Sequence, residues 1–153
     1  MVGPAALMTV NGEPVETGAS TTISLLDALR GLGLCGTTGG CDEGECGSCS
    51  VLVDGVLVCS CLTLAATCDG TEITTIEGVV AADLAQALID EGAVQCGFCT
   101  PGFVMAAVAA LDSGQELDRP TVIEALSGNL CRCTGYQGLI EAVVSVGRSR
   151  AAS

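Results

Sequence analysis

The sequence predicts an α+β fold in two parts, and three observations carry this prediction. Short β-branched runs joined by Asn-Gly or Asp-Gly pairs are confined to the first half of the chain and indicate β-hairpins. From Ala81 onward the apolar residues recur with helical spacing. The cysteines gather twice, between Gly39 and Cys61 and between Cys96 and Cys133, so each part carries its own group of thiols.

Composition excludes several classes of function. The chain has 153 residues, a formal net charge of -13 and no histidine, which disfavours nucleic acid as a partner and excludes His-dependent catalytic triads and His-ligated metal sites. The longest continuous apolar run, Phe103 to Leu111, has nine residues and is too short to span a membrane. Eleven cysteines is an odd count, and the N-terminus lacks a signal-peptide pattern, so we expect a reducing compartment, the cytoplasm, rather than a secreted disulfide scaffold.

The first half predicts two hairpins, one helix and one further strand. Residues 7–10 and 13–16 flank Asn11-Gly12, and Pro14 assigns the second strand to a sheet edge. Ser24, with Asp27 three residues later, predicts the start of a helix that ends at Gly31 or Gly33.

The second hairpin comprises residues 51–53 and 56–58 around Asp54-Gly55, and residues 72–76 give one more strand. Pairing Val53 with Val56 places Cys49 opposite Ser60. We expect this α+β part to end near Glu77.

The second half predicts a bundle of four helices. The first covers residues 81–91 with Leu84, Leu88 and Ile89 as its apolar stripe and ends at Gly92. Thr100-Pro101 reads as a cap followed by the first residue of a helix that runs to Leu111. Capping-box residues Thr121 and Glu124 predict a third helix that ends at Gly128, and a stripe of leucine, isoleucine and valine predicts the fourth, at Leu139, Ile140, Val143 and Val144.

The first cysteine group has the spacing of a plant-type 2Fe-2S site. Cys41, Cys46 and Cys49 read C-x4-C-x2-C, with a further cysteine at Cys59 or Cys61. Both lie one position from the partner of Cys49, so the hairpin geometry does not choose between them. A four-thiolate zinc site is the alternative, but zinc ligands usually come as two short pairs.

The second group, Cys96-x2-Cys99 and Cys131-x-Cys133, is less diagnostic. Four thiolates at predicted helix ends suit an iron-sulfur cluster, but a zinc knuckle or a redox dithiol fits the same spacing. Arg132 lies between two of these thiols, where a cation would offset the negative charge of a cluster; an arginine in a loop is also often only a solvated charge.

Four segments, GCDEGECGSCSVLVDG, SCL, QCGFCTPGF and GNLCRCTGY, occur in this order and together resemble the iron-sulfur subunit of the molybdenum hydroxylases, the xanthine oxidase and carbon monoxide dehydrogenase family. The resemblance covers nearly the whole chain. It implies a β-grasp ferredoxin-like 2Fe-2S domain at residues 1–78 and a four-helix 2Fe-2S domain at residues 79–153. The family's SCL falls on residues 60–62, which assigns Cys61 as the fourth ligand. The implied ligands are Cys41, Cys46, Cys49 and Cys61 for one cluster, and Cys96, Cys99, Cys131 and Cys133 for the other.

The same resemblance implies the place of this chain in a complex. The helical cluster would face a molybdopterin cofactor in a large subunit, with Gln95 and Cys133 against the pterin, and the ferredoxin-like cluster would pass electrons to FAD in a medium subunit. A dimer of heterotrimers is expected. The chain would be the electron-transfer subunit of an oxidoreductase and would turn over no substrate alone. The other hypotheses are a free-standing electron-transfer ferredoxin and a zinc-stabilised interaction module. Cys35, Cys59 and Cys68 match no ligand position, and we expect them to be small buried hydrophobic residues.

Overall fold

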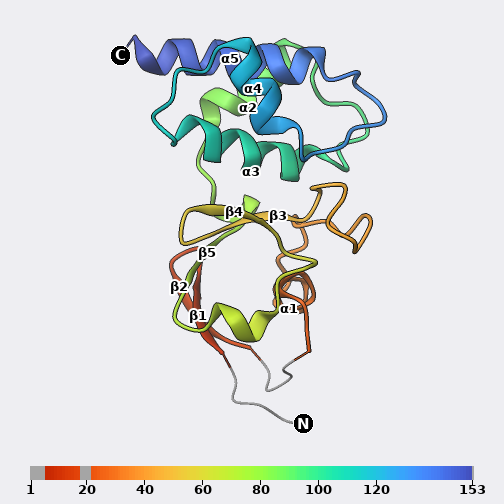
Figure 1. Cartoon of the computed structure of the whole chain (residues 1–153), viewed down its shortest axis with the longest axis vertical. Coiled ribbons are helices and arrows are strands. Elements are labelled where there is room, and N and C mark those ends of the chain that lie inside the picture. The colour runs from red at the N-terminus through yellow and green to blue at the C-terminus, as the bar shows by residue number, and fades with distance from the viewer. Residues whose placement is uncertain (1–5, 18–21, 153) are drawn as a thin grey trace.

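The computed structural model describes residues 6–17 and 22–152. The N-terminal stretch, in which the sequence shows no signal-peptide pattern, includes residues 1–5, which lie outside this description. Figure 1 shows the strands gathered in the lower half of the molecule and a layer of helices in the upper half, with the C-terminal helix at the top. In the described part of the chain, no helix has the length and apolar character that crossing a bilayer requires.

The lower half is built on one mixed sheet with strand order β2-β1-β5-β3-β4. Its strands are β1 Leu7–Val10, β2 Glu13–Glu16, β3 Ser50–Val53, β4 Val56–Cys59 and β5 Glu72–Thr74. β1 and β5 run parallel, and the other neighbours are antiparallel. β2 is an edge strand, as Pro14 predicted.

Both predicted hairpins are confirmed. Asn11 and Gly12 have φ angles of 51° and 85°, and Asp54 and Gly55 have φ angles of 48° and 80°. Positive φ at both central residues defines the type I′ turn, whose twist matches that of the strands it joins. The second hairpin has the predicted register, with Val53 opposite Val56.

Helix α1, Leu25–Gly31, covers one face of this sheet. The Ser24 hydroxyl oxygen accepts a hydrogen bond from the Asp27 N–H at 3.0 Å, so the predicted cap is present. Leu25 and Leu29 are fully buried against Val51 and Ile73 of the sheet.

The last strand is shorter than predicted, because the chain leaves the sheet at Thr75. The Thr75 N–H donates to the Asn11 side-chain oxygen at 2.9 Å instead of to a neighbouring strand. Ile76, predicted as the end of this strand, begins the 3-10 helix η2 Ile76–Gly78. Another short 3-10 helix, η1 Ala65–Cys68, connects β4 to β5.

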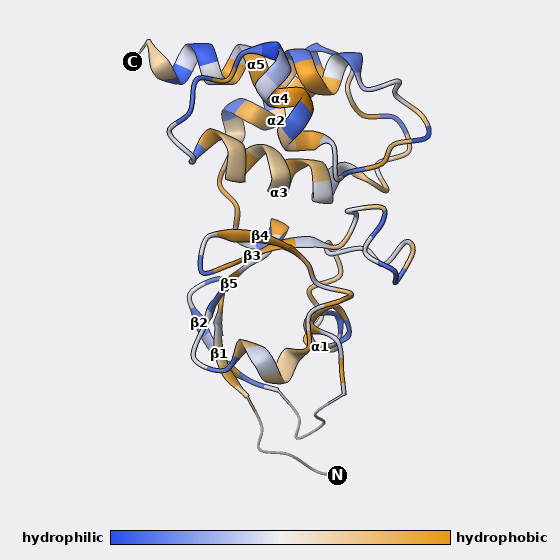
Figure 2. Cartoon of the chain, in the orientation of Figure 1, coloured by the Kyte–Doolittle hydropathy of each residue, from blue (hydrophilic) through white to orange (hydrophobic). Residues whose placement is uncertain are grey.

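Four helices form the upper half, as predicted: α2 Ala82–Asp90, α3 Thr100–Leu111, α4 Arg119–Leu126 and α5 Gln137–Ala151. They enclose a second core around Leu84, Phe103, Val122 and Leu139. Figure 2 shows orange, apolar segments along these helices, alternating with blue, hydrophilic ones. Ile89 was predicted within the buried stripe of α2, but its side chain is 68% exposed.

Two helix starts differ from the prediction. Thr121 and Glu124 do not form a capping box: α4 begins earlier, at Arg119, because Asp118 is the cap and its carboxylate accepts the Thr121 N–H at 2.9 Å. Pro120 then lies in the first turn of the helix, where backbone N–H groups have no acceptor within the helix, so the N–H that proline lacks is not required. Thr100 lies inside α3 rather than capping it, since the turn that begins at Gly97 leads directly into the helix.

The two halves touch where α3 lies along β3 and β4 (Figure 1). Gly102 makes this approach close: a Cβ atom there would lie 2.3 Å from the Gly47 carbonyl oxygen. Helix α3 therefore packs directly on the loop that carries the first cysteines.

Candidate metal centres

The first group of thiols belongs to the loop between α1 and β3 and to the turn after β4. Cys41, Cys46 and Cys49 lie on the loop, and Cys61 follows β4. Gly44 and Gly47 have φ angles of 76° and 67°, a conformation that glycine adopts without steric cost. We call Cys41, Cys46, Cys49 and Cys61 the loop set.

The second hairpin brings the fourth thiol of the loop set back to the other three. The Ser60 N–H donates to the Cys49 carbonyl at 3.3 Å, which confirms the predicted register. The Cys61 thiol contacts that of Cys49, and the Cys41 thiol contacts that of Cys46. The loop set thus consists of two thiol pairs.

The protein environment favours a thiolate at one position of this set. Backbone N–H groups of Glu43 and Cys46 point at the Cys41 sulfur and lower its pKa to about 7. Burial, together with the neighbouring Cys49 thiol, raises the pKa of Cys61 to about 12. Four adjacent thiolates repel one another, so binding of a cation would release the protons that the free thiols retain.

The second group lies at the ends of helices. Cys96 and Cys99 precede α3, and Cys131 and Cys133 lie between α4 and α5; we call these four the helix-end set. The Cys133 thiol is 3.6 Å from that of Cys96, and the Cys99 thiol contacts that of Cys131. This set therefore also consists of two pairs, one exposed and one half-buried.

A side chain supplies the main hydrogen bond to a sulfur of the helix-end set. The Thr134 hydroxyl donates to the Cys131 sulfur at 3.1 Å, and the Thr134 N–H approaches it at 3.4 Å. Burial raises the pKa of Cys131, but these donors outweigh it and lower the value to about 7. Burial and the Cys131 thiol raise the pKa of Cys99 to about 12. The Tyr136 hydroxyl accepts the Cys131 N–H at 2.9 Å and fixes this turn.

Paired thiols fit a cluster with two irons. A 2Fe-2S core distributes its thiolates over two irons and takes hydrogen bonds at sulfur, and both sets offer two thiol pairs with N–H or hydroxyl donors. All eleven cysteines are free thiols.

The two sets are linked through hydrogen bonds between the halves. The Leu130 N–H donates to the Cys46 carbonyl at 2.9 Å, and Leu130 directly precedes Cys131. The Asn129 side chain, only 3% exposed, donates to the Gly47 carbonyl at 2.8 Å. The Thr38 hydroxyl bonds the Phe98 carbonyl at 3.2 Å.

Sequence reasoning assigned no role to three of the residues that support the helix-end set or join it to the loop set. Asn129, Thr134 and Tyr136 all lie within the GNLCRCTGY segment, so the signal was their clustering around the two cysteines. Gly102 likewise follows Cys99 and Pro101. The groups that these four residues contact are either remote in sequence or brought close by the geometry of a turn. The spacing of the residues in the sequence does not show such contacts.

The remaining predicted residues are mostly exposed. Gln95 and Cys133 lie at the surface beside the helix-end set, as does Arg132. The prediction that the three extra cysteines are buried is correct for Cys68 and wrong for Cys35, which is exposed because the chain after α1 runs over the surface; Cys59 is partly buried.

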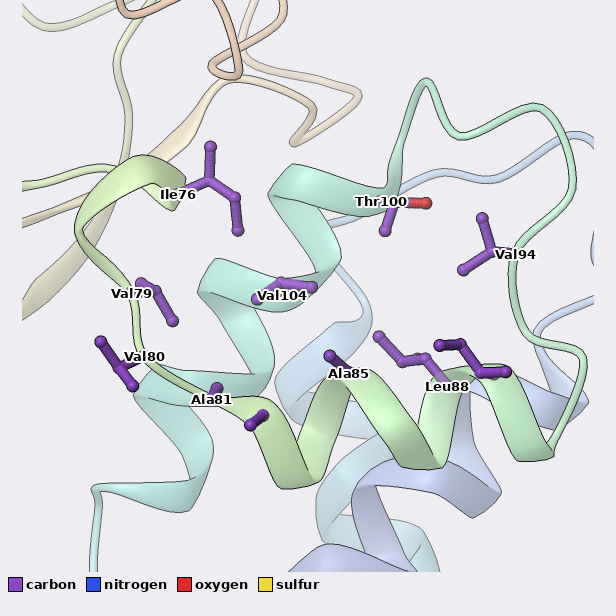
Figure 3. A pocket seen from close by; sticks show the side chains of 11 residues that line it. Ile76, Val79, Val80, Ala81, Ala85, Leu88, Val94, Thr100 and Val104 are labelled. Atoms are coloured by element: carbon purple, nitrogen blue, oxygen red, sulfur yellow. The ribbon is translucent and has the colours of Figure 1, made fainter.

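An apolar groove of about 520 Å³ lies next to the helix-end set, between η2, α2 and the start of α3. Figure 3 shows side chains from the connection between the halves and from both helices pointing into it. Val80 and Ile89 on its rim are 95% and 68% exposed. Val94, next to Gln95 in sequence, also lines it. No charged residue lines the groove.

Two family models match the chain and cover both sets. A "2Fe-2S iron-sulfur cluster binding domain" matches residues 8–85, and a "[2Fe-2S] binding domain" matches residues 75–144. Fold and thiol geometry therefore agree with a protein that binds two 2Fe-2S clusters.

Known relatives identify the family. The chain is 44% identical over 148 residues to the xanthine dehydrogenase iron-sulfur-binding subunit of Escherichia coli O157:H7, covering 93% of each chain. It is 46% identical over 139 residues to the nicotine 6-hydroxylase small subunit of Paenarthrobacter nicotinovorans, covering 88% of this chain and 84% of that one. The crystal structure of quinoline 2-oxidoreductase from Pseudomonas putida 86 superposes with a TM-score of 0.91 at 39% identity, over 99% of this chain and 97% of that one. The chain belongs to the iron-sulfur subunits of the molybdenum hydroxylases and is an electron-transfer subunit of an oxidoreductase.

Proposed function

We propose that the chain carries electrons from a molybdopterin site in a large subunit to FAD in a medium subunit, within a dimer of heterotrimers. Residues 1–78 form the β-grasp ferredoxin-like domain and hold one cluster on the loop set. Residues 79–153 form the helical domain and hold the other on the helix-end set. When bound, each cluster supplies a one-electron carrier.

The backbone link between the two sets is the observation that carries this proposal. Cys46 is a ligand in the loop set, and its carbonyl accepts the N–H of Leu130 at 2.9 Å. The next residue, Cys131, is a ligand in the helix-end set. One hydrogen bond and a few covalent bonds therefore join the two ligand sets, and the buried Asn129 amide holds the same loop in register. Such a link favours a relay over two independent structural metal sites.

The direction of the relay rests on exposure. Gln95, Cys96 and Cys133 are all exposed, and the thiols of Cys96 and Cys133 lie 3.6 Å apart; in our proposal Gln95 and Cys133 contact the pterin there. The adjoining groove presents apolar side chains of the kind that subunit interfaces cover. We therefore place the large subunit on this face. The medium subunit would receive electrons from the loop set.

A free-standing ferredoxin is the second candidate, because the loop set alone would suffice for it. This chain differs from a one-cluster ferredoxin by its whole helical half, which carries the helix-end set.

Eleven free thiols suit the cytoplasm, where a reducing environment keeps them from forming disulfides.

Native purification tests the proposal. On two four-thiolate sites the chain should carry about four irons and about four acid-labile sulfides, and it should co-elute with two larger chains whose extracts contain molybdopterin and FAD. A chain that elutes alone with both clusters would favour the free ferredoxin. A colourless chain with stoichiometric zinc would contradict both.

A further inference from the structure

The turn after β4 brings two thiols, Cys59 and Cys61, to the side of the loop set. Ser60 between them is fully buried, and its hydroxyl donates to the Cys49 carbonyl at 2.7 Å. Cys59 is the last residue of β4, Cys61 lies in the turn that follows it, and both thiols are partly buried. The Leu62 N–H donates to the Cys59 carbonyl at 3.1 Å and closes the turn that holds them together.

The two thiols share their neighbours. Both contact the Cys49 thiol. Both lie against Gly44, the residue midway along the loop: the Cys59 sulfur is 3.8 Å from the Gly44 carbonyl oxygen, and the Gly44 N–H points at the Cys61 sulfur. Cys59 therefore shares two neighbours, the Cys49 thiol and Gly44, with the proposed fourth ligand.

The orientation of Gly44 gives Cys61 the advantage. An N–H group stabilises a thiolate, which is the form that binds iron, whereas a carbonyl accepts the S–H of a neutral thiol. Cys61 thus receives at its sulfur the kind of N–H hydrogen bond that a cluster ligand takes, whereas the Cys59 S–H is directed at a carbonyl oxygen. Because the Cys59 thiol already contacts the thiol of Cys49 in the loop set, a change of ligand needs only a local adjustment of this turn.

We propose that Cys59 is a reserve ligand for the cluster of the loop set and replaces Cys61 when Cys61 is lost as a ligand. In the exchange one iron-sulfur bond to Cys61 breaks and one to Cys59 forms. Cys59 gives up its proton and the released Cys61 thiolate takes one up, so the irons keep their oxidation states and no oxidant or reductant is required. This proposal rests on the ligand set proposed above.

Three variants of the full chain test the reserve role: Cys59→Ala, Cys61→Ala and the double variant. Alanine is used because a serine oxygen can itself bind iron. Iron and acid-labile sulfide per chain are measured together with the paramagnetic resonance spectrum of the dithionite-reduced protein. Cys59→Ala should keep about four irons and the wild-type spectrum. Cys61→Ala should also keep about four, with shifted g values for one signal only, and the double variant should fall twofold to about two.

Loss of half the iron in Cys61→Ala alone would overturn the reserve role. A different outcome corrects the ligand set as well: if Cys59→Ala alone halves the iron and Cys61→Ala does not, Cys59 is the natural ligand and not a reserve. The unchanged signal of the helix-end cluster reports in each sample that the chain is folded. If Cys61→Ala does not accumulate, Cys61→Ser is compared with and without Cys59→Ala, and equal iron content with identical spectra would overturn the proposal.

Discussion

In the sheet-bearing half, Cys41, Cys46 and Cys49 belong to one continuous loop, whereas in the helical half the half-buried pair, Cys99 and Cys131, comes from the ends of different helices. Backbone N–H groups are the donors to Cys41, but a side chain, Thr134, is the main donor to Cys131. A site made by local backbone conformation is therefore visible in sequence spacing. A site made by helix packing depends on contacts between segments that are remote in sequence.

This comparison predicts that the contact between the halves matters most where the backbones meet. Gly102→Ala would place a Cβ atom 2.3 Å from the Gly47 carbonyl, and backbone cannot move aside as a flexible side chain can. We expect a loss of about 2–3 kcal/mol in unfolding free energy, as for overpacked cores. Urea unfolding followed by far-UV circular dichroism and cluster absorption measures it.

Gly128→Ala is the matched control, since a Cβ atom there meets nothing within 4 Å. It should leave the unfolding midpoint nearly unchanged. If both variants unfold at the wild-type midpoint, the close packing of α3 on the cysteine loop does not contribute to stability.

The side-chain donor of the helix-end set can be removed without changing the backbone N–H donors of the loop set. Thr134→Val removes the hydroxyl that lies 3.1 Å from the Cys131 sulfur and keeps the side-chain shape. A hydrogen bond to sulfur stabilises the more negative, reduced cluster, so its loss should lower the reduction potential of the helix-end cluster. If this hydrogen bond stabilises the reduced cluster by about 0.7 kcal/mol more than the oxidised one, its loss lowers the reduction potential by about 30 mV, since one electron is transferred.

Redox titration monitored by paramagnetic resonance resolves the two clusters. Thr134→Ser keeps the hydroxyl and should keep the wild-type potential, and the cluster of the loop set should not change in either variant. Equal potentials in Thr134→Val and Thr134→Ser would show that this hydroxyl does not tune the cluster.

The smallest expected effect concerns the ion pair between α2 and α5. Arg150 Nε lies 2.8 Å from an Asp83 carboxylate oxygen and lowers the pKa of Asp83 to about 2. A lowered pKa stabilises the fold above the unfolded value of about 4, and this contribution disappears as the pH falls toward 2. The side chain of Asp83 is 48% exposed and that of Arg150 is 39% exposed. Asp83→Asn should therefore lower the free energy of unfolding by well under about 1 kcal/mol.

The cost of Asp83→Asn, measured from urea midpoints, should be constant between about pH 5 and 7 and shrink only at lower pH. Asp112→Asn is the control, because Asp112 lies 3.8 Å from Arg150 and should contribute less. A cost for Asp83→Asn that grows as the pH falls would contradict the assigned ion pair.

The same contrast explains how far the sequence could be interpreted. Turn residues such as Asp54-Gly55 determine their own backbone, so both hairpins, their registers and the pairing of Cys49 with Ser60 were predictable. The start of α4 was missed because Asp118 and Thr121 are both good caps, and the one that caps is Asp118, with Pro120 in the first turn after it. The end of β5 was missed because Asn11, far away in sequence, supplies the bond that ends it.

For the candidate centres, the spacing of Cys41, Cys46 and Cys49 indicated a 2Fe-2S site directly. The helix-end set needed the resemblance to a family, since its thiols meet only after the helices pack. Hydrogen-bond partners such as Asn129 and Thr134 could not be assigned, because nothing in their spacing shows which backbone or sulfur atom they reach.

The order of the relay is tested most directly by rapid-freeze paramagnetic resonance on the assembled complex, with substrate as the reductant, in Cys46→Ser and Cys99→Ser variants that each lack one cluster. In Cys46→Ser, substrate should still reduce molybdenum and the helix-end cluster, and electrons should stop before the flavin. In Cys99→Ser, substrate should reduce molybdenum but neither the loop-set cluster nor the flavin. Fast flavin reduction in a Cys99→Ser complex without the helix-end cluster would contradict the account, because it would show that this cluster does not lie on the path.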